Sequence, residues 1–214
     1  MPHIMSHLYI AKETLDGIKS RINDIPQYFL GTLSPDAIEY KEDSSIVHKR
    51  ISHLYEGLEK ENHNILGWIK NVENFYFEHK SDEINDFLLG FCIHIMADIY
   101  NYEFIQTPFR SKFGEEDEKI YKIENRIIDY EIFYRENLKT NIFPYIEKSR
   151  GIDFFNIISI NELNKLKNDS MKIEFAIEQI TTICENKYIT YNKMKESNDN
   201  MVKYIKKEFL DKIN

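Results

Sequence analysis

The sequence predicts an all-α protein, and three features of its composition and patterning support this fold class. Glycine (7) and proline (5) are scarce among the 214 residues, so few positions interrupt a helix. Apolar residues recur at three- and four-residue spacing over long segments, whereas strict two-residue alternation is rare. Apolar residues make up 42% and charged residues 30% of the chain, a composition typical of folded globular proteins. We therefore expect a multi-helix bundle that forms one domain over residues 1–214.

The first half of the chain is expected to form a succession of helices. The first of these ends at a breaker that contains Pro26, and Ser34, Pro35 and Asp36 are typical of a turn or a helix start. The apolar periodicity is clearest in the last of them. The expected helices cover about Ile4–Arg21, Tyr28–Thr32, Ile46–Lys60, Asn62–His79 and Ser81–Phe104.

The second half is expected to contain fewer helices and a loop. The segment Gln106–Gly114 is interpreted as a loop, and the helix that follows it should end before Pro144. Helices are expected over about Asp117–Lys139 and Ser170–Tyr191, with a short final helix that carries Met201, Ile205 and Phe209. No motif is recognisable here, so residues 117–214 are expected to form a helical cover that shapes access to a site in the first half.

Charge and hydropathy argue against two classes of function, nucleic-acid binding and membrane insertion. The formal net charge of −8 is spread along the chain without a basic stripe, so binding to nucleic acid is not favoured, although it is not excluded. No apolar run approaches the roughly 18 residues that span a bilayer, and no leader sequence is recognisable. We therefore expect a cytoplasmic protein without stable membrane insertion. Cys92 and Cys184 lie among apolar residues and are expected to be reduced thiols. The sequence does not indicate an oligomeric state.

Two polar residues continue an apolar stripe of the clearest helix. The stripe contains Ile84, Phe87 and Phe91, and the same spacing leads to His94 and then Asp98. A histidine and an aspartate one turn apart can bind a single cation. They can equally form a hydrogen-bonded pair in a packed core, and spacing alone does not distinguish these two interpretations.

Three further segments each place one suitable ligand beside apolar or tight-turn residues. They are SHL at His7, LGTLSPDA at Asp36 and ISHLYEG at His53. With DFLLGFCIHIMAD, which carries His94 and Asp98, these segments in this order resemble the zinc-dependent phospholipase C family, also called the phospholipase C/D domain. That family is distantly related in fold to the P1-type nucleases. The resemblance covers about residues 1–110.

The resemblance implies a metal site and a bundle of the phospholipase C type. Asp36, His53, His94 and Asp98 match the residues that hold one zinc ion in the family. His7 matches a ligand of a second ion that shares the carboxylate of Asp98. Imidazole and carboxylate ligands suit one or two divalent ions, with zinc the expected metal. Asp36 is also the candidate catalytic base. A nearby cation would lower its pKa, so that it could bind the metal or orient the attacking water but would be a weak base at neutral pH.

The chain also departs from the family pattern. Exported members use a free N-terminal amine as a ligand, for which His3 is a candidate substitute, the alternative being a surface histidine. No histidine follows His94, so a third metal is not expected. Glu103, Glu124 and Asp129 are candidate oxygen ligands, or else ordinary solvated charges.

Several secondary residues have both a functional and a structural interpretation. His48 is a candidate for the same cleft, ranked after His53. Arg110 is a candidate phosphate contact, although an arginine in a loop is more often solvated. Four aromatic residues could line a pocket or belong to the core; they are Tyr100, Tyr102, Phe104 and Phe109.

Three functions follow as hypotheses. The first is a zinc-like metal-dependent hydrolase that acts on a small phosphoester with a metal-activated water as nucleophile. The second is a non-catalytic metal-binding or regulatory protein that keeps the phospholipase C fold. The third is a helical hydrolase of the HD-domain group, which is ranked last because no His-Asp dipeptide occurs in the chain.

Overall fold

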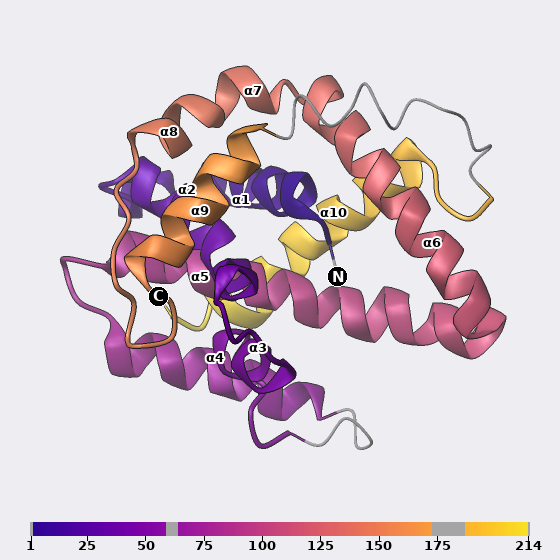
Figure 1. The fold of residues 1–214 in the computed structure, drawn as a ribbon, viewed down its shortest axis with the longest axis horizontal. Coiled ribbons are helices and arrows are strands. Elements are labelled where there is room, and N and C mark those ends of the chain that lie inside the picture. Colours follow the sequence, from indigo (N-terminus) through magenta and orange to yellow (C-terminus); the bar gives the residue numbers. More distant parts are fainter. Residues whose placement is uncertain (1, 59–63, 173–186, 214) are drawn as a thin grey trace.

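The structure is a computed structural model that describes residues 2–58, 64–172 and 187–213. All regular elements within these residues are helices, accompanied by one isolated β-bridge between Phe154 and Ile158. The predicted all-α fold class is therefore confirmed (Figure 1). The elements in chain order are α1 (Ile4–Ile18), η1 (Lys19–Arg21), α2 (Ile25–Leu33), η2 (Ser34–Tyr40), α3 (Ile46–Ser52), α4 (Ile65–His79), α5 (Asn85–Asn101), η4 (Tyr102–Gln106), α6 (Thr107–Arg135), α7 (Leu138–Asn141), α8 (Phe143–Lys148), α9 (Ile160–Lys172), α10 (Tyr191–Ile205) and η7 (Lys206–Leu210).

Helix α5 lies in the interior of the bundle. It contacts α1, α2, α4 and α10, and it runs through the middle of the molecule in Figure 1. Almost all of its side chains are buried, which is what a helix with apolar residues around most of its circumference requires. Polar side chains on α5 therefore lie in the core of the bundle, where they need a polar partner or a cavity beside them.

Two glycines allow α2 and α5 to approach each other closely. A Cβ atom added at Gly31 would lie 2.0 Å from the carbonyl oxygen of Phe87, and one added at Gly90 would lie 2.1 Å from that of Tyr28. Both distances are far below van der Waals contact, and the obstructing atoms belong to the backbone. The two helices can therefore pack at this distance only because neither glycine has a side chain.

The described segments of both halves share one hydrophobic core. Phe133 of α6, Leu138 of α7 and Phe209 of η7 are each at most 1% exposed and belong to the same cluster as the buried residues of α1, α2 and α5. This is the arrangement expected of a single-domain bundle. Among the described helices, none has both the length and the apolar character that a membrane span would need.

The expectation of a helix over Ile46–Lys60 was wrong in its C-terminal part. Helix α3 ends at Ser52, and Leu54 and Gly57 have positive φ angles of 55° and 75° that a right-handed helix does not allow. Helix α4 begins at Ile65 because the side chain of Asn64 caps it by accepting a hydrogen bond from the N–H of Gly67 at 2.8 Å. Residues 59–63, at the ends of the two expected helices, lie outside the described residues.

The expected loop over Gln106–Gly114 is helical in the structure. Helix α5 continues into the π-helical element η4 and then into α6, which kinks at Gly114 (φ 85°). Pro108 lies in the first turn of α6, where its missing N–H group is tolerated. The preceding π-helical turn changes the hydrogen-bond register ahead of the proline. The chain therefore turns only at Gly114.

Other differences lie in the C-terminal half. Helix α6 ends at Arg135, before the left-handed Asn137 (φ 53°), and α7, α8 and α9 had no clear signal in the sequence. The expected helix over Ser170–Tyr191 falls largely on residues 173–186, which lie outside the described residues together with Cys184, and residues 187–190 are not helical. Cys92 is a buried free thiol, as expected.

Candidate metal centre

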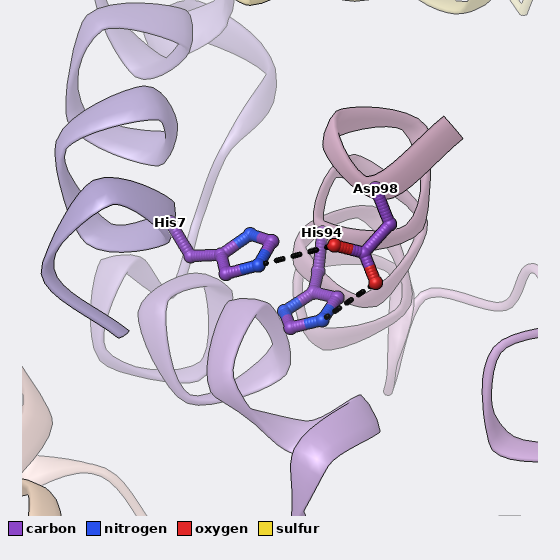
Figure 2. A group of neighbouring side chains, drawn as sticks. All are labelled: His7, His94 and Asp98. Atoms are coloured by element: carbon purple, nitrogen blue, oxygen red, sulfur yellow. Dashed lines mark ion pairs between the residues drawn. The ribbon is translucent and has the colours of Figure 1, made fainter. Parts of the chain in front are cut away.

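Two of the predicted ligands lie on one face of α5. His94 and Asp98 are one helical turn apart, and each is only 1% exposed. Their spacing directs both side chains to the same side of the helix, where they face His7 of α1 (Figure 2). Local helix geometry therefore accounts for this pair.

Three further elements bring the remaining predicted ligands to the pair. His7 lies on α1 and Asp36 lies on η2. His53 is the residue that caps the C-terminus of α3. His7 and His53 are buried, whereas the side chain of Asp36 is 20% exposed. All five residues that the sequence singled out as metal ligands thus lie together, as a cluster to which four segments of the chain contribute.

Asp98 divides its two carboxylate oxygens between the imidazoles. Its Oδ1 lies 3.5 Å from Nε2 of His7, and its Oδ2 lies 3.5 Å from Nε2 of His53 and 3.8 Å from Nε2 of His94. Asp36 places Oδ1 at 3.4 Å from Nε2 of His53 and Oδ2 at 3.9 Å from Nε2 of His94. Ligand atoms at ~2.0–2.2 Å from a tetrahedral zinc ion are about 3.3–3.6 Å apart. The observed separations are close to this spacing.

The polar atoms at the centre of the cluster have no hydrogen-bond partner in the described structure. Leaving such an atom buried and unpaired costs about 1–3 kcal/mol, and more when it is charged. Seven such atoms occur here, and leaving them unpaired would be very unfavourable. Cations at the centre could bind six of them, because His7 directs Nε2 at Asp98 and its Nδ1 therefore points away. The seven atoms are Nδ1 and Nε2 of His7, Oδ1 of Asp36, Nε2 of His53, Nε2 of His94 and both carboxylate oxygens of Asp98.

Hydrogen bonds on the outer side of two imidazoles fix their tautomers. Nδ1 of His94 lies 2.7 Å from the carbonyl oxygen of Thr32, which only accepts, so Nδ1 carries the proton and Nε2 keeps its lone pair. Nδ1 of His53 lies 2.9 Å from Oγ of Ser52, which itself donates to the carbonyl oxygen of Lys49. Oγ therefore accepts from Nδ1–H. Both Nε2 atoms are left as ligands, the arrangement found around bound metal ions.

The electrostatics favour the ligand forms of these groups. Burial, together with the neighbouring His7, lowers the pKa of His94 to about 3, and the rings of His7 and His94 stack at 3.7 Å, which two cations would not do. Burial alone would raise the pKa of Asp36 and Asp98, but the surrounding imidazoles outweigh it. They hold the pKa of Asp36 well below its usual range and lower that of Asp98 to about 2. At neutral pH His94 is therefore neutral and both carboxylates are ionised.

The further candidate oxygen ligands do not belong to the cluster. Asp129 accepts hydrogen bonds at 2.9 and 2.7 Å from two backbone N–H groups in the first turn of α1, and so holds the helix that carries His7. Glu124 accepts from three consecutive backbone N–H groups at residues 187–189. Burial and the charge of Glu208 raise the pKa of Glu103. These three carboxylates therefore do not contribute to the groups of potential metal ligands among the described residues.

Neither His48 nor His3 joins the cluster. Nδ1 of His48 lies 3.1 Å from Oγ of Ser45 at the N-terminus of α3. His3 directly precedes α1, is partly buried, and lines the cavity beside the cluster. Neither residue belongs to the two groups of potential ligands among the described residues, which are His7, His94 and Asp98, and Asp36, His53 and His94.

A cavity of about 600 Å³ opens beside the cluster, and both Asp36 and Asp98 line it. Tyr55, Trp68 and Tyr102 form an aromatic wall, with ring centroids 5.2 Å apart for the first pair and 6.2 Å for the second. Of the four predicted aromatic residues, only Tyr102 is among the described residues that line the cavity. The volume is in the range of small-molecule sites.

Sequence reasoning missed several residues that support the site. Nε1 of Trp68 donates to the backbone carbonyl of His53 at 2.7 Å, and Nζ of Lys49 lies 3.8 Å from Oδ1 of Asp36. The carbonyl of Thr32, which orients His94, is a backbone group that every residue has, so the sequence cannot indicate its role. Trp68 is the single tryptophan of the chain, but nothing near it in sequence connects it with a histidine.

The donor set fits a divalent cation, because neutral imidazole nitrogens and ionised carboxylate oxygens are ligands that zinc accepts. Comparisons of the chain with family models, curated proteins and solved structures gave no match. The interpretation of the cluster therefore depends on its own geometry and on the resemblance of its motifs.

Proposed function

We propose that this protein is a divalent-metal-dependent hydrolase that acts on a small phosphoester, with zinc as the metal. The observation that carries the proposal is the set of six buried, unpartnered nitrogen and oxygen atoms that face one another beside a cavity of about 600 Å³. The resemblance of the four ligand-bearing motifs to the zinc-dependent phospholipase C family supports the same class. A zinc ion held there supplies Lewis acidity, which polarises a phosphoryl group and makes water a better nucleophile at neutral pH.

The chain's own residues would hold the metal in a defined arrangement. Asp36, His53, His94 and Oδ2 of Asp98 surround one position, and Oδ1 of Asp98 faces His7 at a second. If two ions bind, Asp98 would be the residue that they share, because its two oxygens face different imidazoles. Because the fixed tautomers of His53 and His94 present Nε2 lone pairs, these two nitrogens need lose no proton before they bind.

Asp36 is the ligand that faces the substrate. It is the least buried member of the cluster, and it lines the cavity. Its lowered pKa makes it a poor proton acceptor at neutral pH. We therefore assign Asp36 to holding the metal and to orienting the attacking water through a hydrogen bond, the role that the sequence left open beside that of a general base.

The alternative is a metal-binding protein without turnover. Four ligand groups around the first position are enough to complete a tetrahedral shell, and closed four-coordinate sites are typically structural. The cavity that reaches Asp36 and Asp98 favours the hydrolase, because a structural ion needs no access to solvent.

Elemental analysis of protein purified without a histidine tag tests the proposal. We expect roughly one or two equivalents of zinc or another divalent metal in the wild type and none in Asp98→Ala. His79→Ala is the matched control, because His79 is a histidine outside the cluster that stacks on Phe75 at 4.3 Å; its metal content should equal that of the wild type.

Hydrolysis of bis(p-nitrophenyl) phosphate and of p-nitrophenyl phosphate should follow the metal content of these variants. Stoichiometric metal without hydrolysis across a phosphoester screen would favour the non-catalytic alternative. A wild type that takes up no metal would mean that the cluster is a group of buried polar side chains without a bound ion, and the hydrolase proposal would fail.

A further inference from the structure

Helix α5, the π-helical element η4 and the first part of α6 form one continuous helix, and one face of this helix lines the cavity. Asp98 of α5, Tyr102 and Gln106 of η4 and Arg110 of α6 follow one another at four-residue spacing, and all four line the cavity. At 1.5 Å per residue, the twelve residues from Asp98 to Arg110 span about 18 Å along this helix. Arg110 is therefore too distant to contact a phosphate that is bound at the His–Asp cluster.

A buried carboxylate fixes the position of Arg110. Glu118 is 3% exposed and accepts hydrogen bonds from Nε and Nη2 of Arg110, the latter at 2.9 Å, and from Nε2 of Gln106 at 2.9 Å. Nζ of Lys122 lies 2.8 Å from the same carboxylate. The kink of α6 at Gly114 is what returns Glu118 to Arg110, eight residues earlier in the chain.

This arrangement places two cationic side chains at the cavity. Arg110 and Lys122 share the buried carboxylate of Glu118. Glu115 is near enough to Arg110 to raise its pKa further. The side chains of Arg110 and Lys122 are 51% and 57% exposed, and neither forms an ion pair with another carboxylate in the described part of the chain. A guanidinium that is held on one edge by a carboxylate still presents N–H groups on another, in the planar geometry that suits a phosphate.

We propose that Arg110 and Lys122, seated on Glu118, form a second anion subsite for a phosphate group of the substrate. This inference rests on the proposed function, because it concerns the same cavity. The substrate class is then an organic phosphoester that carries a second phosphate about three helical turns from the one at the cluster. The aromatic rings of Tyr102 and Trp68 line the cavity with these groups, and suit an apolar segment between the two phosphates.

Calorimetric titration with synthetic ligands of defined length tests the subsite. Alkane-α,ω-diol bisphosphates and the alkyl monophosphates of equal chain length are titrated into zinc-loaded and into EDTA-treated protein. We expect the wild type to bind the best-fitting bisphosphate about tenfold or more tightly than its monophosphate. This preference should disappear in Arg110→Gln, while the affinity for the monophosphate in zinc-loaded protein stays unchanged.

The matched control is Lys119→Gln, which removes one positive charge from the same helix. Lys119 pairs with Glu116 on the surface and is not among the described residues that line the cavity. Its bisphosphate preference should remain that of the wild type. An equal loss in Lys119→Gln would mean that general charge, and no subsite, attracts the second phosphate.

A second variant keeps the inference testable if Arg110→Gln fails to fold, which thermal melting would reveal. Lys122→Gln leaves the pairing of Arg110 with Glu118 intact, and we expect it to reduce the preference severalfold. An unchanged preference in every folded variant would overturn the subsite. In EDTA-treated protein no metal holds the first phosphate, so the alkyl monophosphate can bind only at the subsite. Loss of this binding in Arg110→Gln, but not in Lys119→Gln, tests the subsite whether or not the proposed hydrolase function holds.

Discussion

Gly90→Ala should disturb both the stability of the bundle and its candidate metal centre. The added methyl group would lie 2.1 Å from the carbonyl oxygen of Tyr28 and 2.8 Å from the backbone nitrogen of Thr32. Backbone atoms of α2 cannot rotate away as a side chain can, so α2 and α5 would have to separate by about 1 Å or more to restore normal contact. Such a shift would also move the carbonyl of Thr32, which fixes the tautomer of His94.

The expected magnitude follows from three contributions. Overpacking in a closely packed core costs about 1–3 kcal/mol, and weakening the hydrogen bond between His94 and Thr32 adds about 1 kcal/mol. The better helix propensity of alanine offsets about 1 kcal/mol of this. The free energy of unfolding should therefore fall by about 1–3 kcal/mol, which corresponds to a melting temperature about 2–12 °C lower for a chain of this size. Loss of the outer hydrogen bond should weaken zinc binding about 10–100-fold.

Gly17→Ala provides the matched control, because no atom lies within 4 Å of the added methyl group. This substitution lies on α1 and should raise the melting temperature by about 1–4 °C through helix propensity alone. Scanning calorimetry and zinc titration of both variants measure the two effects. A Gly90→Ala protein that melts with the wild type and binds zinc equally well would refute the close helix contact and its connection with His94.

Three further predictions concern the metal and the Arg110 network. Zinc at about 100 times its dissociation constant should stabilise the metal-free protein by about 2.7 kcal/mol, or about 5–11 °C, and His94→Ala should show no such shift. Zinc content after dialysis should be complete at pH 7 and should be lost as the pH falls through about 3, the pKa of His94, because protons then compete for this imidazole nitrogen; content that does not change between pH 7 and pH 2 would contradict imidazole ligation. The hydrogen bond from Arg110 lowers the pKa of Glu118, so this carboxylate stabilises the fold above its unfolded pKa of about 4.3 and loses that effect as the pH falls. Glu118→Gln should therefore cost about 1 kcal/mol in urea unfolding at pH 7, because Arg110 is half exposed, and the cost should shrink at pH 3; an equal cost at both values would disprove the charge effect.

Periodicity predicted the helices whose packing is simple and failed where single residues change the backbone. The stripe that runs into His94 and Asp98 identified α5 because every residue of that helix obeys one local geometry. The segment around Pro108 looked like a loop, yet the π-helical turn before it lets the helix continue. The prediction that the helix continues beyond Ser52 was wrong because Leu54 has a positive φ angle. Leucine rarely adopts this conformation, so the sequence does not indicate it.

The sequence by itself determined which residue types are available for a metal and that two of them lie one helical turn apart. It could not determine that Asp98 shares its oxygens between His7 and His53, because these residues lie on separate elements whose distance depends on packing. The close contact that Gly31 and Gly90 permit places the carbonyl of Thr32 against His94. Only the tertiary structure decided this orientation, since a backbone carbonyl has no identity in the sequence and acquires its partner through the approach of two helices.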